Sequence, residues 1–146
     1  MKGPYVQMAL FCEHALQEQD GVLSVVRVVD RVIVNAAGPA PPETMPPTVV
    51  NLKMVLGLKS GEARGRHQLK ILPEDPSAQE MEPRELSLFF EGDGDRGINA
   101  RINFSFRAEI EGLYWFSVLL DEHALSRIPL RVVYNRVQTG GSGQGT

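Results

Sequence analysis

Apolar and polar residues alternate along most of this chain, with the period of two that marks a strand buried on one side. The longest alternating stretch, residues 112–134, predicts one β-hairpin whose arms are joined by the polar residues 121–126. We expect the rest of the chain to cover its apolar side. The positions expected to face a core are Tyr114, Phe116, Val118 and Leu120 in the first arm and Ile128, Leu130, Val132 and Tyr134 in the second.

Further strands are predicted on the N-terminal side of this hairpin. Residues 22–34 are rich in β-branched side chains, which favour sheet over helix, and a bend or bulge at residues 30–31 is expected to split the run. A helical turn is expected at residues 15–19, with a chain reversal at 20–21. The other predicted strands cover residues 5–13, 49–58, 64–73, 85–90 and 98–108.

The turn signals between these segments indicate the fold class. Five prolines in residues 35–48 exclude a central strand there and predict an extended crossover loop. About eight short strands without a convincing amphipathic helix favour an all-β fold. We therefore predict a single antiparallel β-sandwich, immunoglobulin-like or C2-like, over residues 1–138, followed by a flexible Gly/Ser-rich tail at 139–146.

Composition narrows the function classes. The chain of 146 residues is 42% apolar and 23% charged, as expected for one soluble globular domain. A net charge of −3 does not favour nucleic-acid binding. The lone Cys12 excludes an internal disulfide, and there is neither a secretory signal pattern nor an apolar run of the roughly 20 residues that a membrane span needs. We expect a cytoplasmic protein that binds neither nucleic acid nor membrane.

Three passages together resemble a family of small bacterial β-sandwich proteins known only as a domain of unknown function. The chain differs from that family at Arg27, where a glycine is usual, and at Glu122, which replaces the glycine of an Asp-Gly turn; both changes bear on local bulge and turn geometry. The resemblance implies a sandwich and no activity. The passages are residues 6–12, residues 21–32, and residues 112–116 with 129–132.

Two groups of residues have the types needed for covalent catalysis. Cys12 and His14 share a strand face about 7 Å apart, too far for a hydrogen bond, and Cys12 falls among apolar residues as a structural buried cysteine would. Ser117, Asp121 and His123 are the residue types of a hydrolase triad, but all lie on one hairpin. We expect no enzyme activity and no cofactor.

The loop of residues 91–97 holds candidate calcium ligands. Glu91, Asp93 and Asp95 alternate with glycines and bring three carboxylates close together, as hard cations prefer. The closing glutamate of an EF-hand is missing, because that position is Ile102 in a predicted strand. The alternative is a solvated acidic turn.

Arginines project from the outer faces of two predicted strands. Arg101 and Arg107 belong to one strand and Arg127 and Arg131 to another. If both strands lie in one sheet, the arginines form a patch that could dock an acidic partner. The alternative is a solvated face that protects the sheet against edge pairing.

Leu113 and Trp115 lie on the nominally outer face of the first hairpin arm, so that strand is apolar on both sides. Either the proline loop covers them, or they form an apolar patch for a partner or a second copy. The prediction is a non-enzymatic protein-interaction module of unknown partner, with a homodimer as one form. The alternative is a sandwich that binds a carbohydrate or a calcium-dependent target through residues 91–97.

Overall fold

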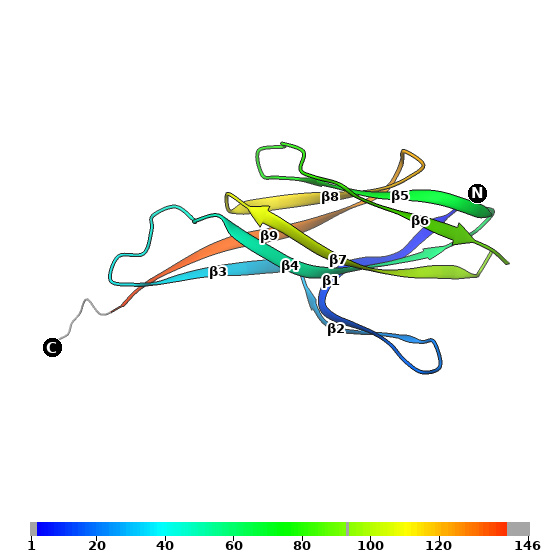
Figure 1. Cartoon of the computed structure of the whole chain (residues 1–146), viewed down its shortest axis with the longest axis horizontal. Coiled ribbons are helices and arrows are strands. Elements are labelled where there is room, and N and C mark those ends of the chain that lie inside the picture. Colours follow the sequence, from blue (N-terminus) through cyan, green and yellow to red (C-terminus); the bar gives the residue numbers. More distant parts are fainter. Residues whose placement is uncertain (1–2, 93, 140–146) are drawn as a thin grey trace.

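The computed structural model describes residues 3–92 and 94–139, and in that part of the chain all regular structure is β-strand (Figure 1). None of these residues belongs to a helix that could cross a membrane. The nine strands are β1 (Tyr5–Gln17), β2 (Leu23–Val29), β3 (Arg31–Gly38), β4 (Thr48–Lys59), β5 (Gly65–Glu74), β6 (Arg84–Phe90), β7 (Gly97–Ala108), β8 (Gly112–Leu120) and β9 (His123–Gln138).

The strands form two sheets, which confirms the predicted β-sandwich. The first sheet has the order β2-β1-β4-β7 and the second the order β3-β9-β8-β5-β6. Neighbours are antiparallel with one exception, since β3 and β9 run parallel over their whole pairing. The all-antiparallel arrangement that the short strands predict is therefore wrong at this pair, because β3 joins the second sheet beside a strand that is remote in sequence.

Most predicted strand positions are confirmed, and residue 30 does divide the β-branched run into β2 and β3. The predicted helical turn at residues 15–19 is wrong. There β1 continues to Gln17, because Ala15 and Leu16 pair with Val25 and Ser24 of β2. The reversal that follows is confirmed, with Gly21 in the left-handed region at φ +87°.

The main core lies between the two sheets and is centred on Phe116 of β8, whose side chain has no exposed surface. Its ring packs against three rings of the first sheet, those of Phe11, Phe104 and Phe106, with centroid distances of 4.8, 5.4 and 5.7 Å. Two of these contacts come from β7, the strand with the cleanest alternation in the sequence. Edge-to-face aromatic packing of this kind joins the sheets.

A smaller apolar cluster covers the other side of the first sheet. Cys12, Ala15 and Val55 are its buried members, and Leu23 and Val25 of β2 pack against them. The β1–β2 hairpin leaves the plane of the first sheet (Figure 1), so its apolar face meets β4. The β1–β2 hairpin and β4 thus form a second, smaller core, separate from the main one.

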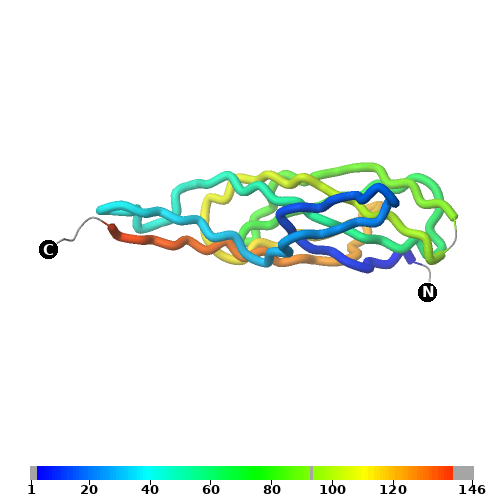
Figure 2. The backbone as a smooth tube through the Cα atoms, turned by 90° about the horizontal axis from the view of Figure 1, so that it is seen from below, coloured from blue at the N-terminus to red at the C-terminus, as the bar shows by residue number. Residues whose placement is uncertain are grey.

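The C-terminal end of the second sheet narrows to a two-stranded ribbon. β8 pairs with β9 only as far as Val132, and beyond it β9 pairs with β3 alone up to Gln138. We call residues 33–38 and 133–138 the arm; Figure 2 shows it projecting from one end of the molecule. The predicted tail, 139–146, lies outside the described residues except for Thr139, whose amide donates to the Gly38 carbonyl at 2.8 Å.

The proline loop begins later than predicted, because residues 35–38 belong to β3 and the first proline is Pro39. The loop is anchored to the arm by two side chains of β9. The Tyr134 hydroxyl donates to the Pro42 carbonyl at 2.6 Å, and the Arg136 guanidinium donates to the Pro41 carbonyl at 3.2 Å. These bonds hold the proline loop against the arm.

Candidate interaction surface

β3 lies at the end of the second sheet, so its outer edge faces no other strand of the described residues. Exposure alternates strictly along it, with odd-numbered side chains exposed and even-numbered ones half-buried. Ile33 is 54% exposed despite its size. The strand pairs with β9 through eight consecutive residues without a register shift, so its outer backbone groups form a regular, extended row.

Two further contacts hold β3 in place. The Arg131 amide donates to the Asp30 carbonyl at 3.1 Å, just before the strand begins. The Asn135 side-chain amide donates to Oδ1 of Asn35 at 2.9 Å in the middle of the arm, where these two residues are register partners. The edge is thus fixed in the conformation that a further strand would need, which reduces the entropy lost on pairing.

Of the other edge strands in the two sheets, β2 is interrupted and β7 is partly covered. In β2, Arg27 adopts a left-handed conformation at φ 60° and its side chain forms an ion pair with Glu13 at 2.9 Å, so the edge is interrupted in its middle. At the opposite side of the sandwich, the Arg84 guanidinium on β6 donates to the Asn103 carbonyl on β7 at 2.6 Å. Arg84 therefore covers part of the β7 edge.

The predicted arginine patch is wrong, because its four members lie in different sheets. Arg101 and Arg107 are on β7 in the first sheet, whereas Arg127 and Arg131 are on β9 in the second. The side chains also have local partners: Arg107 pairs with Glu109 at 2.7 Å. Alternation indicated that these residues point outward, but not which sheet holds each strand.

Trp115 and Leu113 are both half-buried. The Arg127 guanidinium lies 4.5 Å from the centroid of the Trp115 ring and also bonds Glu74 at 3.0 Å. The cover over this ring therefore comes from an arginine on the neighbouring strand, by a cation–π contact, whereas the proline loop is bonded to the arm. Whether Leu113 and Trp115 contact a partner stays a prediction.

The calcium candidates do not converge on a described site. Glu91 and Asp95 are exposed in the connection between β6 and β7, and Asp93 lies outside the described residues. Among residues 3–92 and 94–139, no group of three or more histidines, cysteines, aspartates and glutamates could hold a metal ion.

Cys12 is a buried cysteine, as predicted, with no exposed surface. Burial raises the pKa of its thiol, which disfavours the thiolate that a nucleophile needs. His14, in contrast to Cys12, is exposed. Ser117 pairs in register with Arg127, while Asp121 binds a histidine that the sequence did not associate with it.

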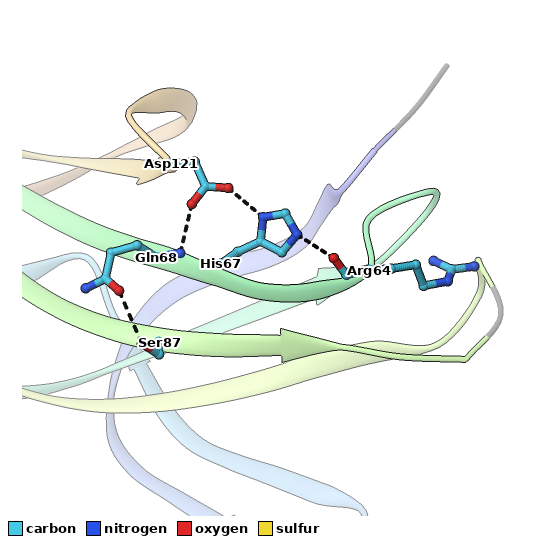
Figure 3. A network of polar contacts seen from close by, with 5 residues as sticks. All are labelled: Arg64, His67, Gln68, Ser87 and Asp121. Atoms are coloured by element: carbon cyan, nitrogen blue, oxygen red, sulfur yellow. Dashed lines mark hydrogen bonds and ion pairs between the residues drawn. The ribbon is translucent and has the colours of Figure 1, made fainter.

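That histidine is His67 of β5 (Figure 3). Nδ1 of His67 lies 2.5 Å from Oδ2 of Asp121, and Nε2 lies 3.0 Å from the Arg64 carbonyl oxygen. Oδ1 of Asp121 accepts the Gln68 amide at 2.9 Å. Both partners of the imidazole are acceptors, so both bonds form fully only when the ring carries two protons.

The bond to Asp121 raises the pKa of His67. The Gln68 amide and the His67 ring together lower the pKa of the Asp121 carboxyl. The pair ties the β8–β9 turn to β5, and it is an ion pair when His67 is protonated. Sequence reasoning missed it because the two residues are 54 positions apart and only the β5–β8 pairing brings them together.

A family model covers nearly the whole sandwich. Residues 7–133 match the model of a family of unknown function, DUF6941. The chain belongs to DUF6941. This confirms the resemblance to a domain of unknown function, while the bacterial origin stays a prediction. No curated protein matches this DUF6941 chain.

A solved structure similar to this DUF6941 domain is a CARDB domain from Pyrococcus furiosus, crystallised in complex with di-metal ions. It is 12% identical, with a TM-score of 0.41, and the alignment covers 91% of this chain and 93% of that one.

Arg27 and Glu122, the two positions where the resemblance led us to expect glycine, both have left-handed backbones. Arg27 has φ 60° and Glu122 has φ 68°, in the region where glycine is the least strained residue. Both positions therefore keep the backbone geometry that glycine favours, with larger side chains in place.

Proposed function

We propose that this domain is a non-enzymatic protein-interaction module that accepts an extended segment of a partner on the outer edge of β3. The regularity of this exposed edge carries the proposal. Between Val32 and Gly38 the strand has no proline, no charged residue and no register shift, the devices by which edges are usually protected. Adding a strand to such an edge is a recurring mode of peptide recognition.

The chemistry of binding follows from the strand. Main-chain hydrogen bonds would supply affinity, each worth roughly 0.5–1.5 kcal/mol net. Ile33 and Ala37 on the exposed face would contact the partner's side chains and so determine specificity, because alternate residues of the added strand lie beside them. The absence of catalysis and a cytoplasmic location belong to the same proposal: the raised pKa of Cys12 weakens the strongest nucleophile candidate, and a lone thiol suits a reducing compartment.

Selection of displayed eight-residue peptides against the full chain tests the proposal. We expect binders with alternating apolar residues, and backbone amide shifts on binding confined to residues 31–38. Ile33→Lys should abolish binding. Val137→Lys, a matched change on the neighbouring strand at a 42% exposed position, should preserve it. Binders whose shifts map instead to Leu113 and Trp115, or to residues 91–97, would contradict the assignment to β3.

A further inference from the structure

We infer that the strand accepted by β3 is β3 of a second copy, paired antiparallel about a two-fold axis at Asn35. This inference rests on the proposed function and names its partner. Four features favour this pairing: the self-complementarity of residues 32–38, the hydrogen-bonding groups of the Asn35 side chain, the position of charge along the strand and the direction in which the arm projects.

Side chains directly opposite each other in an antiparallel pair lie on the same face. With Asn35 opposite Asn35, every larger apolar side chain of one copy meets a small residue of the other, so neither face is overpacked. Shifting the centre by one residue to Val34 would set Ile33 against Asn35 instead. The pairs in the Asn35 register are Ile33 with Ala37, Val34 with Ala36, and Val32 with Gly38.

Asn35 has hydrogen-bonding capacity directed at such a partner. Its Oδ1 accepts the Asn135 amide, and this is the side-chain bond that it makes within the described residues. A carboxamide has two acceptor lone pairs and two N–H donors, so one lone pair and both donors are left. The oxygen is bonded to β9, which leaves the nitrogen available to a partner on the axis. Two Asn35 side chains on the axis can therefore bond reciprocally.

Charge does not oppose this pairing. Residues 32–38 carry none, and Arg31, the one charged residue of β3, lies opposite Pro39 of the second copy, at the end of the paired stretch. Arg31 also has its own counter-ion in Asp30 at 3.4 Å. The two-fold pairing thus sets no like charges opposite each other.

The direction of the arm leaves room for a second copy. β3 runs outward from the body, and beyond Val132 the ribbon contains only β3 and β9 (Figure 2). An antiparallel partner places its own body at the opposite end of the paired arms. The second sheet then continues through both copies.

A cysteine crosslink tests the register in the full chain. Opposed residues of an antiparallel pair have Cα atoms about 4.5–5.5 Å apart, within the range of about 4.4–6.8 Å that a disulfide spans, so Asn35→Cys should crosslink under mild oxidation. Arg31→Cys is the control, because two residues at position 31 would be about 26 Å apart at 3.3 Å per residue. Wild type controls for Cys12, which is buried. Equal crosslinking at both positions would overturn the register.

Sedimentation equilibrium over a concentration series tests the association. We expect a reversible wild-type dimer, a dissociation constant raised tenfold or more by Ile33→Lys, and a constant within twofold of wild type for Val137→Lys. Equal weakening by both variants, or a wild type that stays monomeric up to millimolar concentration, would overturn the inference. In the monomeric case, peptides that still protect residues 31–38 would leave the proposed function standing, and peptides that map elsewhere would remove both.

Discussion

β2 and β3 come from one β-branched run and each forms an edge of its sheet, yet the two edges differ. Val28 on β2 is 61% exposed and Ile33 on β3 is 54% exposed, so exposed apolar surface does not distinguish them. The backbone does: Arg27 interrupts β2 in a left-handed conformation, whereas β3 keeps eight regular pairs with β9. The accessibility of a sheet edge is therefore decided by backbone geometry more than by the side chains it shows.

The largest expected effect concerns the core on which both edges depend. Phe116→Ala should lower the free energy of unfolding by about 3–5 kcal/mol, because the ring contacts three aromatic rings of the other sheet. Urea denaturation followed by circular dichroism measures this loss. Phe89→Ala, at a 57% exposed position, is the control and should change the value by less than about 0.5 kcal/mol.

The next prediction compares the two edges directly. Ile33→Lys should weaken self-association at least tenfold, about 1.4 kcal/mol, whereas Val28→Lys should leave it unchanged, since β2 is already interrupted. Light scattering coupled to size exclusion gives both values. Equal weakening by the two lysines would show that general surface hydrophobicity, rather than the β3 edge, drives association.

A glycine substitution should change the stability of the fold in opposite directions in β2 and in β3. Arg27→Gly should stabilise the fold by about 0.5–1 kcal/mol, because relief of left-handed strain exceeds the loss of an exposed ion pair with Glu13. Ile33→Gly should destabilise it by about 1 kcal/mol, since glycine is unfavourable in a regular strand. Thermal and urea unfolding of both variants measure the pair of changes. A loss of stability in both would refute the strain at residue 27.

The smallest effect lies at the β8–β9 turn, where left-handed Asp121 is held by side-chain bonds. The raised pKa of His67 gives stability that is present below its ordinary value of 6.5 and is lost as pH rises through the folded value. The lowered pKa of Asp121 gives stability that is present above 3.8 and is lost as pH falls through its folded value.

Asp121→Asn should accordingly lower the melting temperature most between about pH 4 and 6.5, and less on either side. Melting curves of wild type and variant over pH 3–9 give the difference. A difference that stays constant with pH would mean that the bond to His67 does not depend on charge.

Alternation along the chain was sufficient to predict the strands, the two-sided character of β8 and the burial of Cys12, because each depends on which way neighbouring side chains point. It also predicted the break at residue 30. It could not indicate that residues 15–17 remain extended, since this depends on their pairing with β2.

Only the tertiary structure decided which strands are neighbours. The His67–Asp121 pair, the separation of Arg101 from Arg131 and the parallel pairing that leaves β3 as an edge all follow from sheet order. Alternation specifies the faces of a strand but not the strand beside it, because backbone hydrogen bonds between strands are the same for almost every residue type. The choice of neighbour is made when the whole core is packed.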